Sequence, residues 1–187
     1  MGHASHVTTA TLEAGCAHVV DAPRNGGVVE LLVARPEPGA RRVLVEAELD
    51  PAVGLVGDCW LSRGSRRTPD GSANPLMQLT LVNARFAALV AGAPEEWVGF
   101  GDQIYADLDV GGDNLPPGTR LAVGTAVVEI TDAPHTGCAK FLDRFGPDAA
   151  RFVNAPLGRA HNLRGVNARV VTGGVVRTGD VIVKRPG

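Results

Sequence analysis

Residues 131–146 read Thr-Asp-Ala-Pro-His-Thr-Gly-Cys-Ala-Lys-Phe-Leu-Asp-Arg-Phe-Gly. The pattern predicts the end of a strand, a tight turn and the beginning of a helix. Thr136 is of a type that caps helix N-termini, and Gly146 suits the residue after a helix C-terminus. Phe141 and Phe145 lie four residues apart and therefore share one face of the helix. This arrangement places Cys138 in the first helical turn.

The position of Cys138 favours reactive sulfur chemistry. Unpaired amides and the positive end of the helix dipole favour a thiolate there. His135 and Lys140 strengthen this effect if their side chains converge on the sulfur. Such a thiolate acts as a nucleophile, a persulfide carrier or a soft metal ligand. The alternative is a small, buried core cysteine, which is the commoner fate of a free thiol. The local pattern leaves both interpretations open.

Glycine and proline divide the rest of the chain into short apolar runs. There are 24 glycines and 13 prolines, nearly all outside these runs. Because the runs between them are short, the pattern favours strands over long helices. The expected strands span 28–34, 43–49, 78–82, 103–110, 121–123, 126–131, 168–171 and 181–184. Helical patterns cover 7–20, 83–91, 138–145 and 148–153, and the polar segment 62–75 is expected to form a long surface loop.

Composition limits the class of protein. A chain of 187 residues with 44% hydrophobic residues fits a single domain over 1–187, with 1–20 as a peripheral helix or a flexible tail. Eighteen basic residues stand against twenty acidic ones, which disfavours nucleic acid and anionic membranes as partners. Three widely spaced cysteines fit neither a disulfide framework nor a structural zinc site. With no basic leader and no run of eighteen apolar residues, we expect a soluble, cytoplasmic protein.

Five blocks along the chain follow the order of a known family. They are Gly-Leu-Val-Gly-Asp at 54–58, Gly-Phe-Gly-Asp-Gln at 99–103, Leu-Pro-Pro-Gly-Thr-Arg-Leu-Ala-Val-Gly at 115–124, Pro-His-Thr-Gly-Cys at 134–138, and Leu-Arg-Gly-Val-Asn-Ala at 163–168 with Gly-Asp at 179–180. In this order they resemble the MOSC domain, the family named for the C-terminal part of molybdenum cofactor sulfurase. The resemblance implies a mainly β fold, an antiparallel β-barrel with a few short peripheral α-helices.

The same resemblance implies a role for Cys138, which stands at the family's cysteine position. In relatives this cysteine carries sulfur or ligates molybdenum in a pterin cofactor (molybdopterin). Two positions depart from the family pattern: Asp102-Gln103 stand where many molybdenum-type relatives have Glu-Asn, and Gly137 replaces a frequent proline. The chain therefore resembles a stand-alone bacterial-type member of the family.

Three functions follow from this resemblance. In the first, Cys138 binds molybdenum cofactor, and the protein is an oxidoreductase that reduces N-hydroxylated substrates with a separate redox partner. In the second, the protein is a sulfur carrier or transferase that cycles through a Cys138 persulfide. Because 187 residues leave no room for a desulfurase domain beside this one, we expect the sulfur to come from a separate cysteine desulfurase, which would hold the pyridoxal phosphate. In the third, the chain is a non-catalytic binding domain.

Further candidate residues lie in other parts of the sequence. Arg63, Arg66 and Arg67 lie in the polar loop and suit a cofactor phosphate, with a solvated loop as the alternative. Arg164, with Asn154 and Asn167 nearby in sequence, also suits an anion, with a salt bridge that pins a loop as the alternative. The predicted site thus has a catalytic group and a cofactor-binding group: Cys138, His135 and Lys140 in the first, and Arg66, Arg67, Asn154, Arg164 and Asn167 in the second, with Cys138 also as the metal ligand.

Overall fold

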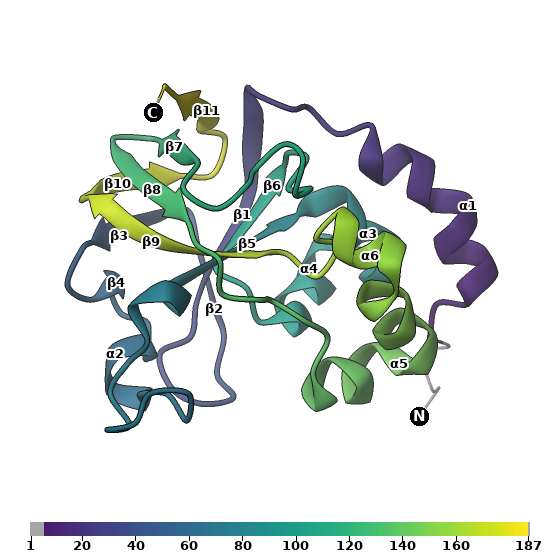
Figure 1. The fold of residues 1–187 in the computed structure, drawn as a ribbon, viewed down its shortest axis with the longest axis horizontal. Helices are drawn as coiled ribbons and strands as arrows, with labels where there is room; N and C mark the ends of the chain where they lie inside the picture. Colours follow the sequence, from purple (N-terminus) through teal and green to yellow (C-terminus); the bar gives the residue numbers. More distant parts are fainter. Residues whose placement is uncertain (1–5, 187) are drawn as a thin grey trace.

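The computed structural model describes residues 6–186, and residues 1–5 of the predicted helix or tail at 1–20 lie outside this range. Most of the strands form one large sheet, and three form a smaller one (Figure 1). The strands are β1 Gly27–Ala34, β2 Arg42–Leu44, β3 Glu46–Asp50, β4 Gly54–Leu55, β5 Leu79–Asn83, β6 Ile104–Asp107, β7 Arg120–Val123, β8 Ala126–Ile130, β9 Val166–Thr172, β10 Gly174–Arg177 and β11 Val181–Arg185.

The large sheet closes into a seven-stranded barrel. Its order is β11-β7-β8-β9-β5-β6-β1, and β1 pairs back onto β11 through Gly27 with Ile182 and Val28 with Val181. Strand β2 extends the sheet beyond β1, while β10, β3 and β4 form the smaller sheet. The predicted mainly β barrel is confirmed. Its pairs are antiparallel except for β5 and β6, which run parallel because helices connect them.

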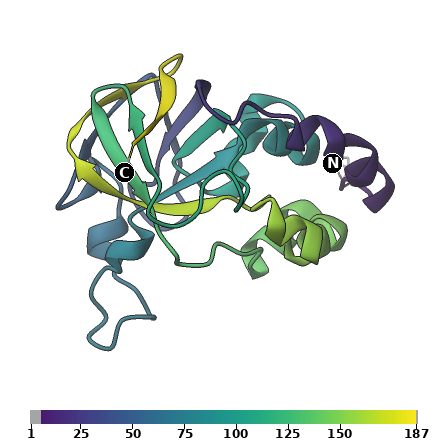
Figure 2. The same cartoon turned by 45° about the horizontal axis from the view of Figure 1, so that its top comes forward.

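The helices cover one side of the barrel, except for α2, which lies near the polar loop (Figures 1 and 2). They are α1 Thr9–Val20, α2 Trp60–Arg63, α3 Ala84–Ala91, α4 Pro94–Trp97, α5 Ala139–Asn154 and α6 Pro156–Ala160, with short 3₁₀ turns η1 Pro75–Met77 and η2 Val98–Phe100. Polar caps set two of the starts: Thr8 accepts from the Thr11 amide at α1, and Asn83 accepts from the Arg85 amide at α3. No helix within 6–186 is long and apolar enough to span a membrane.

An aromatic cluster between barrel and helices holds α5 in place. Phe141 and Phe145 are both buried, as the four-residue spacing predicts. Their ring centroids lie 5.2 and 4.7 Å from that of Phe100 in η2. Such contacts add stability beyond the buried area alone. The N-terminal half of α5, which follows Cys138, is therefore fixed against the barrel wall.

Some predicted elements differ from the structure. The strand expected at 43–49 is interrupted at Val45, which is 83% exposed, and its halves β2 and β3 join different sheets. The helices expected at 138–145 and 148–153 are, by contrast, confirmed as the two halves of α5, which are separated at Gly146, where a φ of 84° and a ψ of 173° are not helical. The loop expected at 62–75 lacks regular structure after α2 ends at Arg63, until η1 begins at Pro75.

Gly165→Ala is expected to lower the free energy of unfolding by about 1–3 kcal/mol, because overpacking has costs of this size. Gly165 precedes β9 with φ at 104°, and an added Cβ would lie 2.6 Å from the carbonyl oxygen of Leu81. Urea unfolding followed by circular dichroism measures the loss. Gly179→Ala is the control, since φ is 92° there and an added Cβ meets no atom within 4 Å. Equal losses in both variants would mean that backbone strain alone is responsible.

Candidate functional site

Cys138 is exposed at the N-terminus of α5. It is the N-cap residue, one position before the helix, and its carbonyl accepts hydrogen bonds of 3.0 Å from the amides of Phe141 and Leu142. Its side chain makes no capping hydrogen bond. By contrast, Cys59 is buried, and Cys16 is half-buried. The buried-core alternative therefore does not describe Cys138, whose sulfur faces solvent.

Two asparagines brace the segment that leads to Cys138. The side-chain oxygen of Asn154 accepts from the Gly137 amide at 3.1 Å, and its nitrogen donates to the Gly137 carbonyl at 3.1 Å. The Asn167 side chain, which is buried, donates to the Ala133 carbonyl at 3.0 Å. The structure thus brings both predicted asparagines to the cysteine loop, where they hold its backbone. The side-chain oxygen of Asn167 is buried and accepts no hydrogen bond from the described residues.

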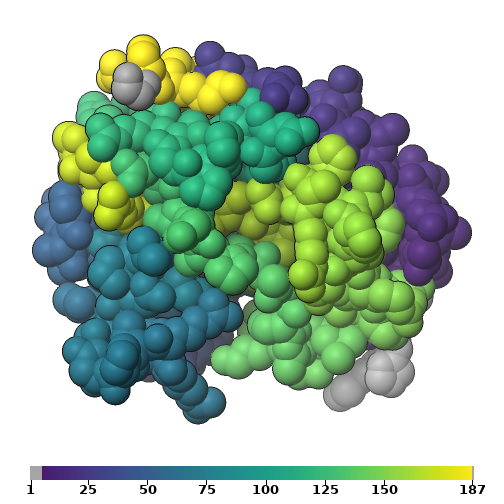
Figure 3. Space-filling model, viewed as in Figure 1, coloured from purple at the N-terminus to yellow at the C-terminus, as the bar shows by residue number. Residues whose placement is uncertain are grey.

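A groove of about 930 Å³ lies between the polar loop and the beginning of α5 (Figure 3). The loop arginines Arg63, Arg66 and Arg67 line it together with Lys140, so the groove gathers four cations that the sequence singled out. Its lining residues include no carboxylate: they are Pro38, Arg63, Gly64, Ser65, Arg66, Arg67, Thr68, Pro69, Gly71, Met77 and Lys140. Such a groove attracts anionic groups, and arginine binds phosphate oxygens bidentately.

A smaller cavity of about 160 Å³ continues from the groove towards the barrel. It shares four lining residues with the groove, among them Arg63 and Met77, and it reaches His135 and Asn167 at its inner end. A cavity of this size holds one six-membered ring. The cationic groove therefore leads to buried polar groups of the cysteine loop.

His135 lies against a buried ion pair. Its Nε2 atom is 3.6 Å from Oδ1 of Asp102, whose Oδ2 bonds to Nη1 of Arg164 at 2.5 Å. Burial and then the nearby Arg164 charge lower the pKa of His135 from 6.5 to about 4, against the opposing effect of Asp102. The imidazole is therefore neutral at pH 7. Its Nδ1 atom is buried and has no hydrogen-bond partner among residues 6–186.

Acidification is expected to destabilise the fold through His135. The unfolded chain binds this proton below pH 6.5, whereas the folded chain binds it only near pH 4. The stability that neutral His135 contributes is thus complete above pH 6.5 and is lost as the pH falls towards 4. Arg164, Arg35 and Arg67 disfavour the imidazolium, and Asp102 favours it.

The measurement is urea unfolding of the wild-type protein and of His135→Gln at several pH values between 4 and 7. The variant is expected to show a shallower loss of stability on acidification. His18→Gln, which changes an exposed histidine of α1, is the control. Parallel curves for wild type and His135→Gln would contradict the assigned protonation state.

Arg164 lies away from the groove. Its side chain is only 7% exposed, its two terminal nitrogens bond to Asp102 and to the carbonyl of Phe100, and its guanidinium lies 5.1 Å from the Phe141 ring centroid. This geometry favours the alternative that Arg164 pins a loop by a salt bridge. Sequence reasoning missed the part played by Asp102, although the block at 99–103 contains it. The signal in the sequence that could have indicated this role is an acidic residue directly after a turn with two glycines, Gly99 and Gly101.

The family profile of the MOSC domain matches residues 78–183, more than half of the chain. The chain belongs to the MOSC domain family. Its fold is similar to the crystal structure of the YuaD protein from Bacillus subtilis, with 18% identity, a TM-score of 0.59, and coverage of 86% of this chain and 97% of that one. A comparison with curated proteins gives no match.

Two structures of YiiM are also similar. The Escherichia coli protein has 17% identity and a TM-score of 0.55, with coverage of 86% of this chain and 70% of that one. The Geobacillus stearothermophilus protein has 15% identity and a TM-score of 0.51, with coverage of 90% and 74%. At these identities the likeness concerns the fold.

Proposed function

We propose that this protein binds molybdenum cofactor through Cys138 and reduces N-hydroxylated substrates with electrons from a separate protein. The observation that carries this proposal is the exposed Cys138, which stands two residues before Lys140, one of the four cations that line the groove. A thiolate is a soft ligand suited to a heavier transition metal. Membership of the MOSC family supports the choice of cofactor.

The residues of the site fit the parts of such a cofactor. Cys138 provides the sulfur ligand, and Arg63, Arg66, Arg67 and Lys140 provide donors for its phosphate. Among the described residues, no cluster of three or more His, Cys, Asp and Glu side chains forms a separate metal site. When bound, the cofactor supplies a metal centre that takes up and passes on electrons.

The polar groups behind the groove orient ligands. The Nε2 atom of neutral His135 lies 3.6 Å from Oδ1 of Asp102, and with the proton on this nitrogen Nδ1 is free to accept a hydrogen bond. Asn167 offers a second acceptor oxygen, and both residues line the inner cavity. Asn154 holds the backbone of the cysteine loop. In this proposal Lys140 binds an anionic group rather than carrying out proton transfer.

Elemental analysis of the protein from a host that makes molybdenum cofactor tests the proposal. Molybdenum and phosphorus are expected in equal amounts, and both are expected to fall in the double variant Arg66→Gln/Arg67→Gln. Arg151→Gln removes a charge from an exposed residue of α5 outside the groove, so it should retain both elements. Purified wild-type protein without either element would contradict the proposal.

A persulfide on Cys138 remains the second candidate function, because the same exposure lets a donor protein reach the sulfur. Mass spectrometry after incubation with a cysteine desulfurase and cysteine tests it. A mass increase of one sulfur atom, present in the wild type and absent in Cys138→Ser, would support sulfur transfer. A protein that takes up neither sulfur nor molybdenum would fit a non-catalytic binding domain.

A further inference from the structure

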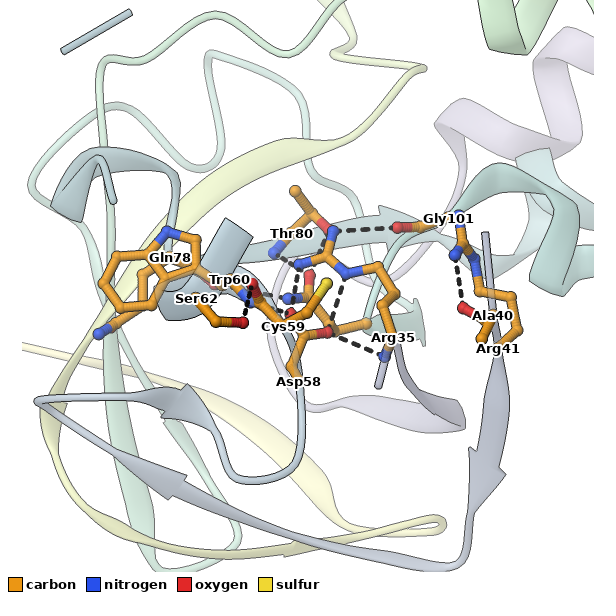
Figure 4. A network of polar contacts seen from close by, with 11 residues as sticks. Arg35, Ala40, Arg41, Asp58, Cys59, Trp60, Ser62, Gln78, Thr80 and Gly101 are labelled. Carbon is orange, nitrogen blue, oxygen red and sulfur yellow. Dashed lines mark hydrogen bonds and ion pairs between the residues drawn. The ribbon is translucent and has the colours of Figure 1, made fainter. Parts of the chain in front are cut away.

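Four arginines meet at the turn formed by η2 and Gly101. Arg144 donates to the carbonyl of Gly99, Arg164 donates to that of Phe100, and Arg35 donates to that of Gly101. The fourth, Arg41, lies close to the same turn, since an added Cβ on Gly101 would be 2.9 Å from its Nη2 atom. Figure 4 shows the Arg41 guanidinium beside Gly101, with Arg35 approaching from the other side.

Only two of these arginines have a carboxylate partner. Arg35 forms a two-pronged ion pair with Asp58, with N···O distances of 2.8 and 3.1 Å, and Arg164 pairs with Asp102. Arg41 and Arg144 have no carboxylate within salt-bridge distance in the part of the chain that the structure describes. The turn therefore carries an excess of positive charge.

Arg41 has a buried nitrogen that lacks a hydrogen-bond partner among the described residues. It is half-buried, its Nη1 donates to its neighbour's carbonyl, that of Ala40, at 2.6 Å, and its Nε is buried without a hydrogen-bond partner among residues 6–186. A buried N–H group without an acceptor is costly. Burial, followed by the charges of Arg144 and Arg35, lowers the pKa of Arg41. An anion placed here would relieve both costs.

We infer that Arg41 and Arg144 form a binding site for a compact oxyanion, a phosphate or the phosphoryl group of a larger ligand. Arginine presents paired N–H donors that match phosphate oxygens. Neither residue lines the cationic groove, but both are close to its wall along the chain: Arg144 stands one helical turn after Lys140 on α5, and Arg41 comes three residues after Pro38. It requires neither Cys138 nor a metal, so it stands apart from the proposed function.

Titration with inorganic phosphate at constant ionic strength tests the inference. Calorimetry gives the affinity, and nuclear magnetic resonance of the arginine Nε–H groups shows which side chain responds. Arg41→Gln and Arg144→Gln are each expected to raise the Kd by about tenfold or more, the loss expected for a charge-assisted hydrogen bond. The Arg41 Nε–H signal is expected to shift on titration, including in the groove variant Arg66→Gln/Arg67→Gln.

Two controls make the result specific. Arg151→Gln changes the net charge equally on the same helix, and Cys138→Ser removes the proposed metal ligand, so both should bind phosphate as the wild type does. The same titration is repeated with a nucleoside diphosphate. If only inorganic phosphate binds, the site takes a free oxyanion. If the diphosphate binds much more tightly than phosphate, the site takes a phosphoryl group of a larger ligand. The inference is overturned if the Arg41 signal does not respond to either ligand, or if Arg151→Gln weakens binding as much as Arg144→Gln.

Discussion

Cys138→Ser is expected to abolish molybdenum retention and substrate reduction while the melting temperature stays the same or rises slightly. The exchange preserves the size of the side chain but replaces a soft, acidic thiol with a hard, weakly acidic hydroxyl. Cys138 is exposed and its side chain makes no capping bond, so the fold loses no contact. Serine is a preferred N-cap residue, and this preference favours α5.

Cys59→Ser is the matched control for this experiment. Cys59 is 5% exposed, so a serine hydroxyl there would be buried. The expected loss is about 1–3 kcal/mol of unfolding free energy if the hydroxyl finds no partner. Molybdenum content per folded molecule should not change. A lower melting temperature for Cys138→Ser together with retained activity would mean that Cys138 is a structural residue.

Asp102→Ala is expected to destabilise the protein by about 3–5 kcal/mol, the cost of breaking a buried pair and leaving one charge uncompensated. The Asp102 side chain has no exposed surface, and that of Arg164 is 7% exposed. Without the carboxylate, the Arg164 guanidinium keeps only its bond to the Phe100 carbonyl and its contacts with aromatic rings. Urea unfolding at pH 7 measures the change.

Two further variants separate charge from packing at this position. Adding Arg164→Met to Asp102→Ala is expected to recover part of the stability, because the uncompensated charge is gone. Arg169→Ala breaks an exposed pair with Glu129 and should cost less than about 1 kcal/mol. If Asp102→Ala lowered the free energy of unfolding no more than Arg169→Ala does, the buried pair of Asp102 and Arg164 would contribute little to the stability of the fold.

Short-range patterns were sufficient to predict most of the barrel. The runs that became β1, β5, β7, β8, β9 and β11 are apolar and bounded by turn residues, so propensity and burial agree there. Two strands were missed, because β4 has only two residues and β10 four, beginning with Gly174. The sequence also did not indicate that 43–49 is divided into two strands. Valine is common in strands, so nothing in the pattern marks Val45 as the exposed residue between two sheets.

The sequence placed candidate residues together where they are close along the chain. Cys138, His135 and Lys140 come from one stretch, and the loop arginines follow from its polarity. Contacts between distant segments were not predictable: Asp102 and Arg164 are 62 residues apart, and only the fold brings them together. Arg41 and Arg144 were not predicted to meet at one glycine-containing turn for the same reason: they are far apart in the sequence, and the residues around each give no sign of the other.

The closure of the barrel between β1 and β11 has a consequence for synthesis of the protein. These partners are separated by about 150 residues, and β11 is the last barrel strand to leave the ribosome. At about 5–20 residues per second, the ribosome holds β1 and β7 without their shared neighbour for many seconds. During that interval their free edges can pair with other nascent chains. The barrel therefore cannot close until β11 has been made, and the edges of β1 and β7 that β11 covers stay open until then.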